Sequence, residues 1–134
     1  MLMTGSPTMD AQRAFSRAAR ARRLALLRRT RGRLPVLEPW VRPTVGHRVR
    51  EIPLEQITGT LEPGRATLFD AEFRPAPAAA ARWQGLWLAE QRGTVLPPIS
   101  VVRVAGGYAV RDGHHRVSVA RARGGVTIDA HVEG

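Results

Sequence analysis

The chain has 134 residues, contains no cysteine and carries a formal net charge of +10. This length is enough for one well-packed domain and short for two. The absence of cysteine excludes disulfides, thiolate metal ligands and thiol catalysis. No apolar run approaches the roughly 20 residues that span a bilayer. The first residues also lack the pattern of a secretory signal, so we expect a cytoplasmic protein without a membrane span.

The positive charge is concentrated in the first part of the chain, and every basic residue is an arginine. Residues 1–50 contain 12 arginines and two acidic residues, whereas residues 51–134 contain nine of each. This asymmetry predicts a basic segment, residues 1–48, joined to a neutral domain, residues 49–134.

The basic segment divides into a helix and a linker. Asp10 is a candidate N-cap for a helix from about Ala11 to Thr30. Its apolar stripe consists mostly of alanines and is narrow, which predicts weak docking onto the domain. From Gly32 to His47, repeated prolines exclude a helix and predict an extended linker, which Trp40 is expected to pin to the domain.

The neutral domain begins with a short strand at 49–52. A β-branched run predicts an interior strand at 99–104. Between them, a helix is predicted at 78–91, with a proline before its start and a glycine after its end. Trp83 and Trp87 lie at helical spacing in this helix and are expected to face the core.

The last part of the chain has the clearest pattern. Gly106-Gly107 predicts a two-residue hairpin turn that returns into a strand at 108–111. After Asp112-Gly113, a helix is predicted at 114–123, and residues 126–132 alternate as a half-buried strand does. The elements together predict an α/β (α+β) fold, a small mixed β-sheet of about four strands with flanking helices, preceded by the basic helix.

The residues Asp112-Gly113-His114-His115-Arg116 lie where a strand gives way to a helix. A helix N terminus has unpaired N–H groups and a partial positive charge, and it attracts phosphate. Gly113 leaves room for a ligand near the backbone, and Arg116 can hold phosphate oxygens bidentately. His114 and His115 can donate to oxyanions or exchange protons near neutral pH. Asp112 can cap the helix, orient a histidine or bind a cation.

Simpler interpretations of the same residues stay open. Asp-Gly is a common turn, so Asp112 can be no more than a cap, and a histidine pair is often only solvated. A metal site has less support, because adjacent histidines such as His114 and His115 rarely chelate one ion and no third ligand lies at a useful spacing. We therefore predict an anion site and no metal site held by protein ligands alone.

Three segments occur in an order typical of one superfamily. They are EIPLEQI (51–57), LPPISVV (96–102) and GGYAVRDGHHRVSVARARGGVTIDAHV (106–132). Over about residues 49–132 the chain resembles the N-terminal domain of ParB chromosome-partition proteins and the wider ParB/sulfiredoxin superfamily. The third segment is the most specific, being similar to the family's strand, Gly-x-x-Arg helix and closing strand. We expect no helix-turn-helix or dimerisation domain of the partition proteins within the 134 residues.

The resemblance implies roles for individual residues. In partition proteins the corresponding box is Gly-Glu-Arg-Arg and binds the triphosphate of CTP. Gly113 and Arg116 match it, whereas His114 and His115 replace its two central residues. In sulfiredoxins the box is Gly-Cys-His-Arg, and His114 stands at the position of the cysteine, so sulfiredoxin's thiol chemistry is excluded here.

Some superfamily members are free-serine kinases with a similar Gly-x-His-Arg box and an upstream carboxylate base. Glu55 and Glu62 are the nearby carboxylates that the resemblance offers for that role. This leaves a small phosphotransferase or nucleotide hydrolase as the alternative function, with His114, His115, Glu55 or Glu62 as candidate catalytic groups.

The leading function is a module that binds a nucleotide, CTP or ATP/ADP with Mg²⁺, or a phosphorylated small molecule, through residues 112–116. A further hypothesis is association with DNA through residues 10–50, where contacts to phosphates would be sequence-independent and salt-sensitive. A solvated extension, a contact with a protein partner or anionic membrane, and a homodimer stay open. The sequence does not decide whether the protein is an enzyme.

Overall fold

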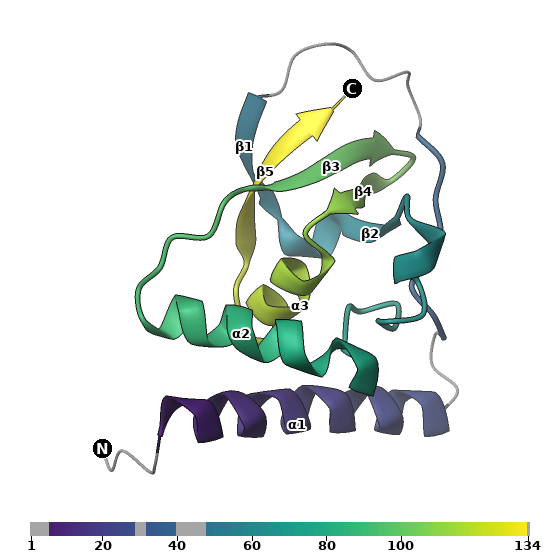
Figure 1. Cartoon of the computed structure of the whole chain (residues 1–134). Helices are drawn as coiled ribbons and strands as arrows, with labels where there is room; N and C mark the ends of the chain where they lie inside the picture. The colour runs from purple at the N-terminus through teal and green to yellow at the C-terminus, as the bar shows by residue number, and fades with distance from the viewer. Residues whose placement is uncertain (1–5, 29–31, 40–47, 134) are drawn as a thin grey trace.

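Five strands form the centre of the fold. The computed structural model describes residues 6–28, 32–39 and 48–133, and its strands lie in one sheet in the order β1-β5-β3-β4-β2 (Figure 1). The strands are β1 (Arg48–Pro53), β2 (Ile57–Thr60), β3 (Ile99–Val104), β4 (Gly107–Asp112) and β5 (Thr127–Glu133). β1–β5 and β3–β4 are antiparallel, whereas β3–β5 and β2–β4 are parallel. The predicted α+β class with a small mixed sheet is confirmed, with five strands instead of about four.

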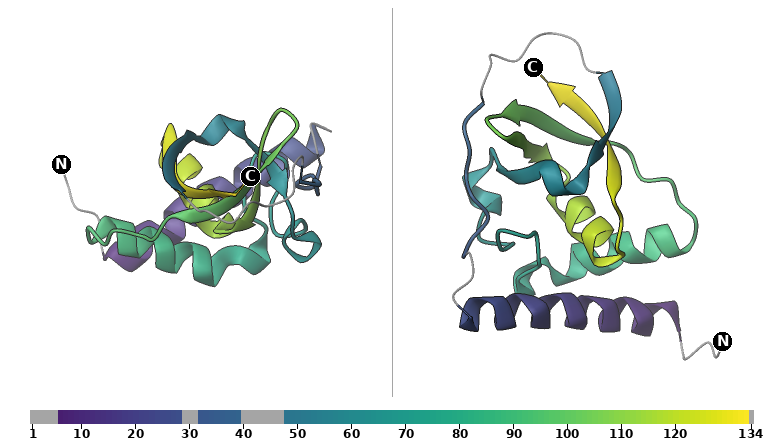
Figure 2. Two further views of the ribbon diagram at one scale, coloured as in Figure 1. Left: turned by 90° about the horizontal axis from the view of Figure 1, so that it is seen from above. Right: turned by 180° about the vertical axis from the view of Figure 1, so that it is seen from behind.

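Three α-helices lie below this sheet in the view of Figure 1. They are α1 (Pro7–Leu27), α2 (Ala80–Gln91) and α3 (His114–Ala122), and short 3-10 turns occupy Leu54–Gln56, Pro63–Arg65 and Pro77–Ala79. α3 contacts the sheet, α2 packs against α3, and α1 runs along α2, as opposite views show (Figure 1 and Figure 2). No helix in the described residues is long and apolar enough to cross a membrane.

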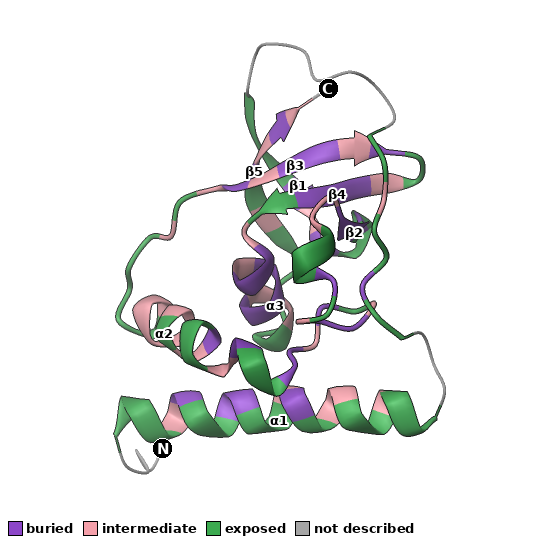
Figure 3. Ribbon diagram, turned by 45° about the vertical axis from the view of Figure 1, so that its right-hand side comes forward, coloured by how far each residue is buried: buried purple, intermediate pink, exposed green. Residues whose placement is uncertain are grey.

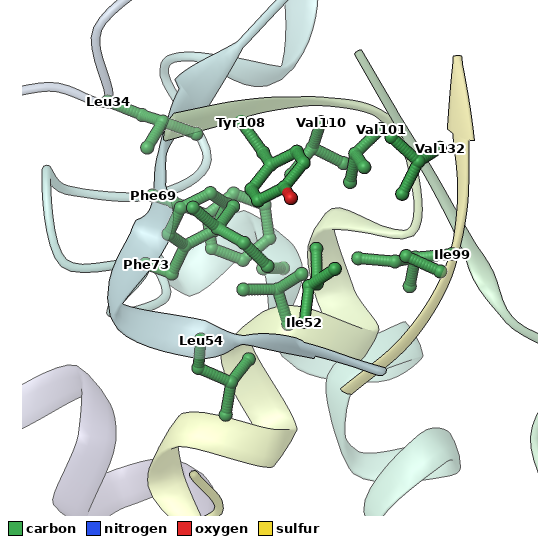
Figure 4. Packing of buried hydrophobic residues seen from close by; sticks show 14 residues of the cluster. Leu34, Ile52, Leu54, Phe69, Phe73, Ile99, Val101, Tyr108, Val110 and Val132 are labelled. Atoms are coloured by element: carbon green, nitrogen blue, oxygen red, sulfur yellow. The ribbon is translucent and has the colours of Figure 1, made fainter. Parts of the chain in front are cut away.

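The main core lies between the sheet and α3. β-Branched residues of β3 and β4 fill it, together with Phe69 and Phe73 from the irregular segment before α2 (Figure 4). Trp83 is fully buried, as predicted, but in a second cluster between α2 and α1. Trp87 also packs against this second cluster, although it is less deeply buried than Trp83. Trp87 is half-buried, with the Arg123 guanidinium 4.4 Å from its ring centroid, because this turn of α2 borders an open groove.

The helix α1 begins earlier than the sequence analysis predicts. The Oγ of Ser6 accepts a hydrogen bond from the N–H of Met9 at 3.3 Å, and Pro7 occupies the first turn, so Ser6 rather than Asp10 is the N-cap. Serine and proline are the preferred residues at these two positions. Asp10 lies in the first turn instead, where its charge complements the helix dipole. The predicted end at Thr30 lies outside the described residues.

The alanine stripe of α1 is buried against α2. Ala11, Ala14 and Ala19 are at most 5% exposed, and Phe15 meets Trp83 edge-on with ring centroids 5.5 Å apart. Figure 3 shows the buried positions of α1 facing α2 and the exposed positions facing away. The narrow stripe therefore forms a continuous contact, in which Phe15 supplies the one large side chain.

Phe15→Ala is expected to loosen α1 from α2, because it removes the buried ring that meets Trp83. Truncating a buried phenylalanine costs about 3 kcal/mol of folding free energy. Thermal unfolding would measure the loss, and amide hydrogen exchange would show whether the protection of α1 falls selectively. Leu27→Ala is the matched control, since Leu27 is 80% exposed on the same helix. Equal exchange of α1 in both variants would contradict this role of Phe15.

The first half of the predicted linker packs onto the domain in extended form. Leu34 is 1% exposed, and its N–H donates to the carbonyl of Phe69 at 3.2 Å. The N–H of Leu37 donates to the Thr60 carbonyl at 2.8 Å, and the N–H of Thr60 donates to the Pro35 carbonyl at 2.9 Å. Residues 32–39 thus cover the free edge of β2. The second half of the predicted linker, with Trp40, lies outside the described residues.

Candidate functional site

The box at 112–116 has the predicted strand–turn–helix geometry. β4 ends at Asp112, Gly113 turns the chain with φ 109°, and α3 begins at His114. A Cβ on Gly113 would collide with the side chain of Ile99 and lie 3.2 Å from Nη2 of Arg116. The sequence alone suggests that the missing side chain makes room for a ligand. In the structure that space belongs to Ile99, so glycine is required by the backbone angle and by packing.

A small pocket of about 170 Å³ lies in front of this box. The 3-10 turn and α2 contribute Glu62, Arg65, Arg82 and Leu86 to its lining, and residues 111–116 contribute the rest. We call it the basic pocket, because four arginines line it against two carboxylates. The N terminus of α3 opens into it without a side-chain cap, so amide N–H groups of its first turn can donate to an anion.

Two arginines of the basic pocket were not found by sequence reasoning. Arg65 ends the 3-10 turn after β2, and Arg82 lies in the first turns of α2. Both are exposed, and neither forms an ion pair with a described residue, whereas Arg111 pairs with Glu133 at 3.0 Å. No local pattern around Arg65 or Arg82 links them to the box. Their charges are therefore available to a ligand.

His114 is buried at the back of the basic pocket. Its Nε2 lies 2.6 Å from Oγ1 of Thr60, which also accepts from the N–H of Glu62 at 2.8 Å. The ring stacks on Phe69 at a centroid distance of 6.4 Å. Burial, and then the charge of Arg65, lower the pKa of His114 from 6.5 to about 4. His114 is thus neutral at pH 7 and joins the end of β2 to the start of α3.

His115 differs from His114 in having no hydrogen-bond partner among the described residues. It is 7% exposed, and its ring lies edge-on to Phe69 at 5.2 Å. Burial, followed by the charges of Arg82 and Arg65, lowers the pKa of His115 from 6.5 to about 4. A neutral imidazole with an unpaired nitrogen can accept a proton or donate to an oxyanion. Of the two histidines, His115 is therefore the one available to a ligand.

Arg116 is already engaged by the protein. Its Nη1 donates to the carbonyls of Pro97 at 2.6 Å and Pro98 at 3.0 Å, and its Nη2 donates to Oδ2 of Asp112 at 3.0 Å. The side chain is 11% exposed, whereas that of Asp112 is 71% exposed. A guanidinium has five N–H donors, so two remain for a ligand after these three bonds. Arg116 shapes the pocket wall as well as adding charge to it.

The two candidate carboxylate bases lie at different sites. Glu62 lines the basic pocket. Glu55 lies in the 3-10 turn at Leu54–Gln56, before β2, and lines a separate, larger groove. Because Glu55 precedes β2 and Glu62 follows it, the strand holds them apart, and the structure brings only Glu62 together with His115. Within residues 6–28, 32–39 and 48–133, no group of three or more histidine, aspartate or glutamate residues is arranged to hold a metal ion.

The similarity of this chain to known proteins is found among solved structures. The sequence matches no family model and no curated protein. The crystal structure of sulfiredoxin from Arabidopsis thaliana is similar to this structure over 63% of this chain and 83% of that chain, with 25% sequence identity and a TM-score of 0.46.

Lowering the pH from 7 to 5 is expected to destabilise the fold through His114 and His115. Their pKa values are about 4 when folded and 6.5 when exposed, so between these values the unfolded chain binds more protons. The two histidines therefore make their full contribution to the unfolding free energy above pH 6.5, and this contribution falls toward pH 4, by about 2 kcal/mol per histidine at pH 5. Denaturant unfolding across this range measures the slope.

The variant His115→Gln separates this effect from general acid sensitivity. This variant removes one of the two histidines with a lowered pKa. The change in unfolding free energy between pH 5 and pH 7 should therefore be about half as large. Nuclear magnetic resonance (NMR) titration of the two rings checks the cause directly. A titration midpoint near pH 6.5 for both rings in the folded protein would show that their pKa values are not lowered and would refute this explanation.

Proposed function

We propose that the protein binds a phosphate-bearing ligand, foremost a nucleotide, in the basic pocket. The observation that carries this proposal is the convergence of Arg65 and Arg82, neither of which forms an ion pair within the described part of the chain, on the uncapped N terminus of α3. Such a helix end and free guanidinium groups both favour multiply charged oxyanions. The ring of His115, which has no hydrogen-bond partner among the described residues, adds a further polar group that can contact a phosphate oxygen.

The size of the basic pocket limits which part of the ligand it can hold. About 170 Å³ suits phosphate groups and is below the roughly 300 Å³ at which pockets for whole small molecules begin. The phosphates would therefore lie inside, with the ribose and base on the surface outside. Asp112 and Glu62 supply carboxylates at the pocket that can ligate a Mg²⁺ ion accompanying the phosphates.

A second candidate function is phosphoryl transfer in the same pocket. Glu62 and the neutral His115 both line it, and either can act as a general base. An acceptor hydroxyl would lose its proton to one of them while its oxygen attacks the terminal phosphorus. The nucleoside diphosphate would then leave with the electrons of the broken P–O bond. Formation of a phosphorylated product, lost in Glu62→Gln or His115→Gln, would separate this activity from binding alone.

Association with nucleic acid through α1 is a separate proposal. Arg13, Arg17, Arg20 and Arg23 are exposed on α1, and the exposed positions of this helix lie largely on the side that faces away from α2 (Figure 3). Contacts from such a stripe to backbone phosphates would weaken steeply with salt. A salt titration of DNA binding, with Arg17→Ala and Arg20→Ala combined, tests it. An unchanged salt slope in that variant would exclude α1 as the contact.

The experiment that tests the basic pocket is a thermal-shift panel of CTP, ATP, ADP and GTP, with and without Mg²⁺. A ligand at 100 times its Kd stabilises the native state by about 2.7 kcal/mol, which raises Tm by roughly 5–15 °C for a domain of this size. Arg82→Ala should weaken the active nucleotide about 10-fold or more, because it removes a charge-assisted contact.

Arg92→Ala is the matched control, since Arg92 is an exposed arginine at the end of the same helix and lies outside the basic pocket. The bound phosphates should also raise the pKa of His115, because an adjacent anion favours the imidazolium. No nucleotide-dependent shift in Tm, or equal losses in Arg82→Ala and Arg92→Ala, would overturn the proposal.

A further inference from the structure

The free edge of β2 is covered by a segment that is separate from the basic pocket. Residues 32–39, which we call the strap, run alongside β2 (Figure 1). Leu34 is the one buried side chain of the strap, and most of its other residues are exposed. None of the described strap residues belongs to the lining of the basic pocket. The strap can therefore affect the pocket only through the residues that it contacts.

Gly59 of β2 leaves room for the strap to approach closely. A Cβ at this position would collide with the carbonyl oxygen of Pro35 and would lie 2.6 Å from Cδ1 of Leu37. Gly59 is not among the glycines with a positive φ, so its backbone would accept an L side chain. Glycine is therefore required here by the approach of the strap rather than by the backbone angle.

The first connection between the strap and the basic pocket passes through Thr60. Its N–H donates to the carbonyl of Pro35 at 2.9 Å, and its carbonyl accepts from the N–H of Leu37 at 2.8 Å. Its Oγ1 accepts from the N–H of Glu62 at 2.8 Å and lies 2.6 Å from Nε2 of His114. Glu62 and His114 both line the basic pocket. The backbone of Thr60 thus bonds to the strap, and its side chain bonds to the pocket wall.

The second connection passes through Phe69. Its carbonyl accepts a hydrogen bond from the N–H of Leu34 at 3.2 Å. Its ring stacks on His114 at a centroid distance of 6.4 Å and meets His115 edge-on at 5.2 Å. Two separate contacts of the strap therefore lead to the histidines at the N terminus of α3.

We propose that the strap is a positioning element of the basic pocket, which it holds in the geometry that binds phosphate. The stretch of chain between Thr60 and Phe69 carries Glu62 and Arg65, so docking of the strap at both ends sets where these two side chains lie. By linkage, phosphate in the pocket holds the strap more tightly in turn. This inference rests on the proposed phosphate-binding function and adds control of that site by a segment outside it.

The test compares Gly59→Ala with Gly32→Ala in the full chain, with inorganic pyrophosphate as the probe. Gly59→Ala pushes the strap away from β2, whereas a Cβ on Gly32, in the strap itself, would meet nothing within 4 Å. Isothermal titration calorimetry, at a temperature where all variants are folded, should show binding about 10-fold weaker for Gly59→Ala. Gly32→Ala should bind like the parent. Equal affinity of Gly59→Ala and the parent would overturn the proposal.

Two further measurements test the coupling without bulk at β2. Leu34→Ala removes the buried side chain of the strap and should also weaken pyrophosphate binding. In the parent, pyrophosphate should slow hydrogen exchange of the N–H groups of Leu34 and Leu37, which bond across the strap contact. The N–H of Thr94, at the far end of α2, should not respond. Unchanged exchange of the two strap amides at saturating pyrophosphate would contradict the coupling.

A ligand-free measurement separates this inference from the proposed function. In Gly59→Ala, NMR titration should show the pKa values of His114 and His115 raised from about 4 toward 6.5, because release of the strap lets water reach both rings. Unchanged pKa values in a folded Gly59→Ala would refute the role of the strap, whether or not phosphate binds. If the parent binds neither pyrophosphate nor a nucleotide, the proposed function fails, and raised pKa values would still show that the strap sets the geometry of the pocket.

Discussion

Gly113→Ala is expected to destabilise the fold by about 3 kcal/mol or more. The backbone at Gly113 has φ 109°, which an L side chain adopts at a cost of about 1–2 kcal/mol. The added Cβ would also lie 2.7 Å from Cβ of Ile99, a fully buried residue of β3 that cannot move aside. Overpacking of this kind adds roughly 1–3 kcal/mol.

A glycine-to-alanine substitution at Gly85 should have the opposite effect on stability. Gly85 lies inside α2, and a Cβ there would meet nothing within 4 Å. Gly85→Ala should therefore stabilise the protein by about 1 kcal/mol, since alanine is the better helix former. Denaturant unfolding of both variants measures the contrast. Equal stability of Gly113→Ala and the parent would show that the turn between β4 and α3 is adaptable.

The region around Gly113 was predictable because its signals are local. The Gly106-Gly107 turn, the Asp112-Gly113 break and the Gly124-Gly125 stop each act within a few residues, and they agree with one another. β2 was not predicted as a strand. Its four residues, Ile57–Thr60, include a glycine and two threonines, and they are extended because they pair in parallel with β4, about 50 residues later. Such non-local pairing leaves little trace in a short segment.

The topology also explains which part of the site was found. The box at 112–116 is contiguous, so its chemistry is visible in the sequence. Arg65 and Glu62 reach it only because β2 and β4 are parallel neighbours, so that the chain leaving β2 arrives beside the end of β4. Arg82 arrives by a different route, through the packing of α2 against α3. Neither the pairing of β2 with β4 nor the packing of α2 against α3 can be inferred from the sequence around residues 112–116.

The role of Arg116 shows the limit of reasoning from a motif. The sequence gives a basic residue at the first turn of a helix, and its resemblance to a phosphate-binding box favours a ligand contact. The structure adds that three of its five donors are held by Pro97, Pro98 and Asp112. Those carbonyls belong to the segment that leads into β3, which lies far from the box in sequence.

Arg116→Ala is therefore expected to lower stability even without ligand, by about 2–4 kcal/mol. It leaves two carbonyls without their donor and releases the segment that leads into β3. Arg116→Lys keeps the charge but cannot make the three bonds at once, so its stability should be intermediate. Asp112→Asn is the control, because the Asp112 carboxylate is 71% exposed and its ion pair with Arg116 contributes little.

Comparison with Arg82→Ala decides between a structural and a ligand-binding role for Arg116. Arg82 is exposed and forms no ion pair with a described residue, so its loss should reduce nucleotide binding while leaving the unliganded Tm nearly unchanged. Arg116→Ala should reduce both, because the pocket wall itself depends on it. Thermal unfolding with and without the active nucleotide measures the two quantities together. Arg116→Ala would instead keep the parent Tm and lose only the ligand-dependent shift if Arg116 were mainly a ligand contact. That result would show that its hydrogen bonds to the carbonyls of Pro97 and Pro98 are not needed for stability.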